Sequence, residues 1–206
     1  MQSDLQINHR NFIIYKFLNS LFTGVSVGIL FVIYSNNIEP STYSLGGIAL
    51  AGLMMMLSLM YSKILNNYYF FRISLFVELV LLFLIIYFLI FSFSTTTSLL
   101  IYCGYQLSFV FGSYLLRAET LSLKKDKILT WVDMSKNAGY LVGLLVSFLF
   151  YKIIESDFQF QVLGYNISGL NIANNELQVF NIHYLLLIIE VIIIFSLIKS
   201  FKRVKN

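Results

Sequence analysis

Two glutamates are the residues of this sequence most suited to chemistry. Glu78 lies in the apolar stretch 76–83, and Glu190 lies in a similar stretch, 188–195. A charge in the middle of a bilayer costs several kcal/mol unless it is paired or faces water, so each carboxyl group is expected to be protonated or partnered. Each glutamate is therefore a candidate proton site. The alternative is a protonated carboxyl group that holds two helices together by a hydrogen bond.

A second group of polar and aromatic side chains lies in two other apolar runs. Three of them, Lys16, Asn19 and Thr23, are spaced three and four residues apart and share one helix face. Lys16 is close enough to the end of its run to extend its amine to water. The candidate lining of a cavity for an organic solute consists of Lys16, Asn19, Thr23, Tyr102, Tyr105 and Gln106. In the alternative reading, the tyrosines anchor the chain at the membrane interface and the rest pack internally.

Charged residues also gather where the fourth run ends and the fifth begins. Arg117 and Glu119 are expected to close one helix, and Asp133 and Lys136 to open the next. Asp133 and Lys136 are three residues apart and face the same side of a helix. The group predicts an ion-pair cluster that latches a cytoplasmic gate, or one that only caps the helices.

No enzyme signature is present. The two histidines, His9 and His183, lie near opposite ends of the chain, and Cys103 is the single cysteine. No HExxH, GxSxG or phosphate-binding loop occurs. We therefore expect no catalysis, no metal and no cofactor. The net charge of +4 comes from basic residues placed as membrane topology requires, so we expect no nucleic-acid partner.

The elements that position these residues are six apolar runs. With 58% hydrophobic and 12% charged residues, the chain has too little polar surface to cover a soluble globule. Each run reaches the roughly 20 residues that a membrane helix needs. The sequence predicts an all-α polytopic membrane protein, a single domain 1–206, with six transmembrane helices at about 12–34, 42–62, 69–92, 96–116, 131–151 and 182–200.

The connections alternate between basic and non-basic. Lysine and arginine occur in 62–73, 117–130 and the tail, whereas 35–41 and 93–97 have neither. The positive-inside rule then predicts that both termini are cytoplasmic, and the Ile-, Phe-, Asn- and Lys-rich composition favours a bacterial inner membrane. In the outer loop 152–181, alternation at 158–162 and 177–180 predicts a β-hairpin or lid. The alternative is an irregular connector.

The two halves of the chain resemble each other. The stretches around Glu78 and Glu190 match, and small residues recur at spacing four in the first and fourth runs: Ser20, Gly24, Gly28 and Gly104, Ser108, Gly112. This pattern predicts a 3+3 inverted repeat. Further small residues in the second and fifth runs allow close helix packing or a surface where two six-helix units meet: Gly46, Gly47, Ala49, Ala51, Gly52, Gly139, Gly143 and Ser147.

One region resembles a known family. The stretch 112–117, the basic loop 124–127 and the glycine-containing stretch 137–143 are similar to the N-terminal half of major facilitator superfamily transporters. There, a basic loop leads into a fifth helix with close-set glycines. The resemblance implies that helices one and four line a cavity, two and five contact another half, and three and six are outer supports. It would assign Glu78 and Glu190 to the scaffold.

Such a transporter has twelve helices, so the resemblance implies a homodimer or a complementary six-helix half. The expected function is a half-size secondary transporter that moves a small solute by alternating access, with the proton as the candidate coupling ion. The alternative is a non-transporting membrane scaffold or accessory subunit of another membrane complex.

Overall fold

The chain folds almost entirely into helices. The computed structural model describes residues 5–37, 40–91, 95–123, 125–155 and 173–203. The helices are α1 (His9–Asn37), α2 (Pro40–Leu59), the short α3 (Tyr61–Ile64), α4 (Asn67–Phe91), α5 (Thr95–Leu123), α6 (Asp126–Glu155) and α7 (Ala173–Ser200). Two short strands, β1 (Leu5–Ile7) and β2 (Phe201–Arg203), complete these elements.

Several predicted boundaries are wrong because the helices extend beyond the apolar runs. The segment 117–130 was expected to be a connection, but α5 continues to Leu123 and α6 begins at Asp126. Arg117 and Glu119 therefore lie inside α5, and Asp133 and Lys136 inside α6. The stretch 177–180, expected as a strand, belongs to α7, since a short alternating stretch cannot be told from the end of a long helix. The other expected strand, 158–162, lies outside the described residues.

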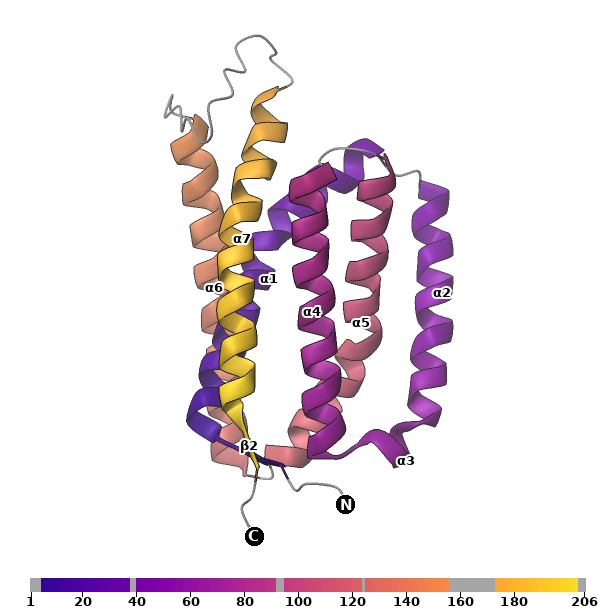
Figure 1. Cartoon of the computed structure of the whole chain (residues 1–206), viewed down its shortest axis with the longest axis vertical. Helices are drawn as coiled ribbons and strands as arrows, with labels where there is room; N and C mark the ends of the chain where they lie inside the picture. Colours follow the sequence, from indigo (N-terminus) through magenta and orange to yellow (C-terminus); the bar gives the residue numbers. More distant parts are fainter. Residues whose placement is uncertain (1–4, 38–39, 92–94, 124, 156–172, 204–206) are drawn as a thin grey trace.

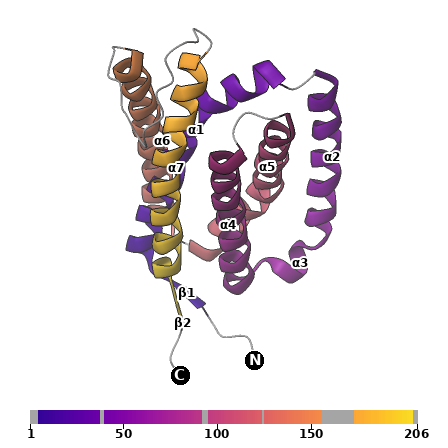
Figure 2. The same cartoon turned by 45° about the horizontal axis from the view of Figure 1, so that its top comes forward.

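The long helices form two layers with a helix at each edge. α4 and α7 lie side by side, α1 and α5 lie behind them, and α6 and α2 occupy opposite edges (Figures 1 and 2). α1 packs along α6 and α7, α4 packs along α5 and α7, and α2 packs along α5. This arrangement brings α1, α4, α5 and α7, which carry most of the candidate residues, to the centre.

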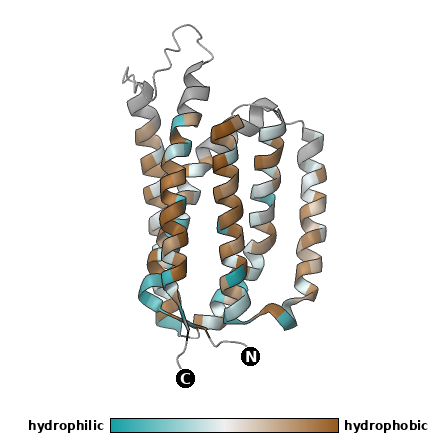
Figure 3. Ribbon diagram, viewed as in Figure 1, coloured by the Kyte–Doolittle hydropathy of each residue, from teal (hydrophilic) through white to brown (hydrophobic). Residues whose placement is uncertain are grey.

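The outer surface of the bundle carries many large apolar side chains. In α4 the buried residues recur every three or four positions, for example Val77, Leu81 and Leu84, while Phe76 and Phe83 on the other side are exposed. Figure 3 shows hydrophobic residues along the length of the central helices and hydrophilic ones gathered near the end where the termini lie. An exposed apolar surface of this extent suits lipid rather than water.

Three helices in the described part of the chain are long and apolar enough to cross a membrane. They are Asn67–Phe91, Thr96–Leu123 and Phe180–Ser200. The mean hydropathy of the most apolar 18-residue window is 2.9, 1.4 and 2.3, respectively. A shorter apolar helix covers Ser44–Leu59. These helices are consistent with an integral membrane protein.

Glycines bring α1 and α6 into backbone contact. A Cβ at Gly24, Gly139 or Gly143 would overlap a carbonyl oxygen of the facing helix. The predicted close packing therefore occurs between α1 and α6. Because Gly139 and Gly143 contact α1, they do not belong to a surface that contacts a second unit. The matching small residues of α5 behave differently: Gly104 packs against Leu84, and a Cβ at Gly112 would meet nothing within 4 Å.

A small antiparallel sheet joins the two ends of the described chain, a feature absent from the all-α expectation. Leu5 pairs with Arg203, and Gln6 pairs with Lys202. The amide of Asn8 also donates to the Ser200 carbonyl at 2.8 Å. The sheet binds the start of α1 to the end of α7, so both ends of the described chain lie at one end of the bundle (Figure 1).

Candidate functional site

One buried carboxylate joins three helices. Oε2 of Glu119 on α5 lies 2.6 Å from Nζ of Lys16 on α1. The other oxygen of Glu119 pairs with Nζ of Lys136 on α6, which is also 3.3 Å from Oδ1 of Asp133. The Glu119 side chain is only 1% exposed, whereas that of Asp133 is 58% exposed. The cluster therefore extends from the bundle surface into its interior and contains two positive and two negative groups.

The composition of this ion cluster (Lys16, Glu119, Asp133 and Lys136) differs from the expected one. Lys16 is close enough to the end of its run to extend to water, but the structure buries it and pairs it with Glu119, which lies one turn further along α5 than the apolar run. Arg117 lies elsewhere, with its guanidinium 5.7 Å from the centre of the Tyr61 ring on α3. The structure thus brings together three of the four expected gate residues and adds one expected cavity residue.

The two glutamates predicted as acids are neighbours in the core. Glu78 and Glu190 lie on α4 and α7, are 2% and 0% exposed, and interact directly. From α1, the hydroxyl of Tyr15 donates to Oε1 of Glu78 at 2.7 Å, and Nδ2 of Asn19 donates to the same oxygen at 3.0 Å. The other oxygen of Glu78 and both oxygens of Glu190 receive no hydrogen bond from a donor group of the described residues, and the two carboxyl groups are placed to hydrogen-bond to each other.

The ion cluster and the acid pair (Glu78 and Glu190) are adjacent. Tyr15 and Lys16 are consecutive residues of α1: the first contacts Glu78, and the second pairs with Glu119. Lys16 also interacts electrostatically with Glu78. A change of charge in the acid pair therefore changes the electrostatic energy of Lys16, the cation that joins α1 to α5. Sequence reasoning missed Tyr15, although its spacing of four from Asn19 places both on one helix face.

The remaining candidate cavity residues are dispersed. The hydroxyl of Thr23, an exposed residue, donates to the Asn19 carbonyl at 3.0 Å, which is an ordinary helix contact. Tyr102 is buried beside Gly46 of α2. The side-chain oxygen of Gln106 is buried without a partner among the described residues.

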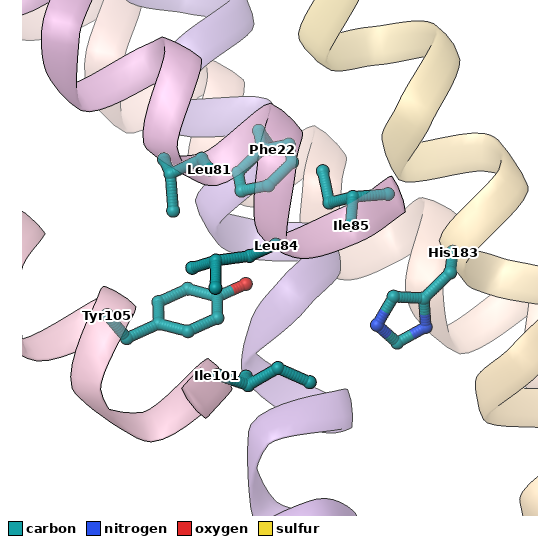
Figure 4. Close-up of a pocket in the computed structure, with 7 residues that line it drawn as sticks. All are labelled: Phe22, Leu81, Leu84, Ile85, Ile101, Tyr105 and His183. Carbon is teal, nitrogen blue, oxygen red and sulfur yellow. The ribbon is translucent and has the colours of Figure 1, made fainter. Parts of the chain in front are cut away.

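Tyr105 lines a small cavity between α1, α4, α5 and α7. Its ring lies beside Leu84, and His183 closes the other end (Figure 4). The volume is about 10 Å³, which is room for about one water molecule. The lining is Phe22, Leu81, Leu84, Ile85, Ile101, Tyr105 and His183. A solute therefore needs more space than this cavity offers.

Comparison with known proteins adds no relative. No protein-family model, no curated protein and no solved structure matches the chain. Among the residues that the structure describes, no group of three or more His, Cys, Asp and Glu side chains is arranged to hold a metal ion. The packing of the helices and the two buried polar groups are therefore the features that bear on function.

Proposed function

We propose that this protein is a half-size secondary transporter, in which one six-helix unit and a second unit form the pathway for a small solute. The observation that carries the proposal is an approximate exchange symmetry in which helices pack against each other, although the α1–α6 contact is much more extensive than its equivalent, α5–α2. Exchanging α1 with α5, α2 with α6, and α4 with α7 converts the α1–α6 contact into α5–α2, and the α1–α7 contact into α5–α4. The α4–α7 contact is converted into itself.

The acid pair obeys the same symmetry. Glu78 and Glu190 are equivalent under the exchange of α4 with α7, and they meet where these helices pack. Each is also near the midpoint of its apolar helix, Asn67–Phe91 or Phe180–Ser200. Two three-helix repeats of opposite orientation produce this pairing, and such repeats are typical of secondary transporters. The packing thus supports the inverted repeat and the resemblance to half of a major facilitator superfamily transporter.

The proposal requires all six long helices to cross the membrane. At about 1.5 Å per residue, a 20-residue helix is about 30 Å long, which matches the bilayer core. The shortest long helix, α2, has 20 residues, and α1 and α6 have 29 and 30. With six crossings both termini lie on one side, and the basic residues near 63–72, 117–127 and 199–205 favour the cytoplasmic side.

One face of the unit is suited to a partner. Thr23 on α1 and Gly112 on α5 are exposed, and these helices lie behind the α4–α7 layer. A Cβ at Gly112 would meet nothing within 4 Å. At the adjacent edge, α2 exposes Leu45, Ile48 and Met55. We propose that a second copy of the chain covers α2 and that the faces of α1 and α5 line the pathway between the copies.

Cysteine labelling tests this arrangement. Thr23→Cys and Gly112→Cys, each in a Cys103→Ser background, would be treated in sealed vesicles with a membrane-impermeant thiol reagent from one side and then from the other. A transporter with alternating access makes both positions reactive from both sides. The matched control is Phe195→Cys on α7, whose native side chain is 63% exposed on the apolar surface and which should stay unreactive in lipid.

The results separate the two candidate functions. Labelling of Thr23→Cys and Gly112→Cys together with a dimer in mild detergent supports the half-transporter. Absence of labelling from both sides, in a monomer or in a complex with other proteins, would instead support a non-transporting scaffold or accessory subunit.

A further inference from the structure

Three carboxyl oxygens in the core need an explanation. Oε2 of Glu78 and both oxygens of Glu190 are buried and receive no hydrogen bond from a donor group of the described residues, although the two carboxyl groups are placed to hydrogen-bond to each other. A buried polar group normally has a partner, and each exception calls for a bound ligand or a function. The two glutamates are equivalent under the packing symmetry and face each other from α4 and α7.

We propose that the acid pair is a binding site for a single proton. Binding converts one carboxylate into a carboxylic acid, whose O–H can donate to a neighbouring oxygen, with no other reactant consumed. One negative charge then remains, and Tyr15 and Asn19 stabilise it by their hydrogen bonds to Oε1 of Glu78. Without the proton, two negative charges would face each other in apolar surroundings.

The groups around the pair favour a proton over a metal cation. Tyr15 and Asn19 direct donors, an O–H and an N–H, at Glu78. Hard cations such as sodium, calcium or magnesium require several oxygen acceptors around them. The described residues hold no group of three or more acidic, histidine or cysteine side chains placed for a metal. A proton needs only one acceptor oxygen and one neighbour.

Other titratable groups surround the acid pair. From α1, Tyr15 interacts with both glutamates and Lys16 with Glu78. From α5, Tyr105 interacts with Glu190. On α7 itself, His183 lies two turns from Glu190 and stacks on Phe88. Lys16 is the only one of these four that also belongs to the ion cluster, which α5 and α6 complete through Glu119, Lys136 and Asp133.

The interaction of Lys16 with Glu78 would couple the proton to the ion cluster. This coupling rests on the proposed transport function. When the pair loses its proton, Glu78 and Glu119 compete for the same cation. Weakening of the Lys16–Glu119 ion pair would loosen α1 from α5, the two helices expected to line the pathway. Binding of the proton would restore the pair, so the occupancy of the acid pair would couple to the closure of the ion cluster.

Infrared spectroscopy of the full chain in detergent tests the site directly. The C=O group of a protonated carboxyl absorbs at a different infrared frequency from a carboxylate. We expect the band of the protonated form at neutral pH. Labelling only glutamate with a heavy isotope should shift it in the unmodified protein, so the assignment does not depend on a variant. Glu190→Gln should remove it, because the remaining Glu78 carboxylate keeps the hydrogen bonds of Tyr15 and Asn19. Glu78→Gln should retain it, because Glu190 stays buried, and the double variant should lack it. Asp126→Asn, at an exposed carboxyl in the first turn of α6, should retain it.

Three results would overturn the proton site: absence of the glutamate band at neutral pH, its retention in Glu190→Gln, or its loss when sodium replaces choline in the buffer, which would indicate a cation site. His183→Asn should leave the band in place. The infrared band does not depend on transport. Absence of the band together with labelling of Thr23→Cys from both sides would therefore reject only the proton site. Presence of the band without labelling of Thr23→Cys from either side would reject only the half-transporter.

Discussion

Nζ of Lys16 lies 2.6 Å from Oε2 of Glu119, so the first long helix and the fourth are joined at a carboxylate that is almost fully buried. Lys136 binds the other oxygen of the same group. A buried charge that loses its partner destabilises a fold far more than an exposed one. The two lysines therefore differ from ordinary basic residues of a membrane protein, which extend to water.

Lys16→Met is expected to destabilise the bundle. Glu119 would keep one cation, Lys136, so the free energy of unfolding should fall by about 1–3 kcal/mol. Glu119→Gln leaves two cations facing each other, and its free energy of unfolding should fall by about 3–5 kcal/mol. Denaturant unfolding in detergent measures both values. The control is Lys125→Met at an exposed position. Equal stability of Lys16→Met and the control would contradict the buried ion pair.

Gly139→Ala is expected to separate α1 from α6. The added Cβ would overlap the carbonyl oxygen of Phe17, so the helices must move apart at a cost of about 1–3 kcal/mol. Gly112→Ala is the matched control, because its Cβ meets nothing within 4 Å. Thermal unfolding should show a lower transition temperature for Gly139→Ala and no decrease for the control. The reverse order would show that the α1–α6 contact is wrong.

Tyr15→Phe removes one of the two hydrogen bonds to Glu78 and little else. Because the acceptor is buried, we expect a loss of about 1–3 kcal/mol in unfolding free energy. Tyr140→Phe, at a residue 40% exposed on α6, should stay within about 0.5 kcal/mol of the parent protein. If the two variants are equally stable, Tyr15 does not hold Glu78.

A disulfide tests the sheet that joins the chain ends. Gln6→Cys with Lys202→Cys, in the Cys103→Ser background, places two thiols at directly paired positions, and such a pair is within the range of a disulfide. Mild oxidation should give a cross-linked monomer that migrates faster in non-reducing electrophoresis. Leu5→Cys with Phe201→Cys is out of register by two residues and should cross-link less. Equal cross-linking of both pairs would contradict the register.

The sequence predicts the helices better than their contacts. Each of the six predicted runs overlaps a long helix, although the second run, 42–62, continues past the end of α2 at Leu59 into α3. Three of the long helices are apolar enough over their length to cross a membrane. Helix ends were less predictable, because polar residues such as Arg117 and Asp126 continue a helix past the apolar run. Which face of α4 is buried could not be predicted either, because Phe76 and Val77 are equally apolar, yet one is 49% exposed and the other 7%.

The candidate site was predicted only in part, for a related reason. Isolated charges in apolar runs identify Glu78 and Glu190, but their meeting depends on how α4 and α7 pack. Lys16 and Glu119 are 103 positions apart in the sequence, and no local pattern links them. Only the tertiary arrangement assigns Lys16 to an ion pair rather than to a cavity wall.

The pairing of Gln6 with Lys202 also sets an order for biosynthesis. A ribosome adds roughly 5–20 residues per second, so about 10–40 s separate the emergence of β1 from that of β2. During this interval α1 can form while its amino-terminal end lacks a strand partner. The contact that holds the start of α1 to the end of α7 is therefore among the last in the described chain to form.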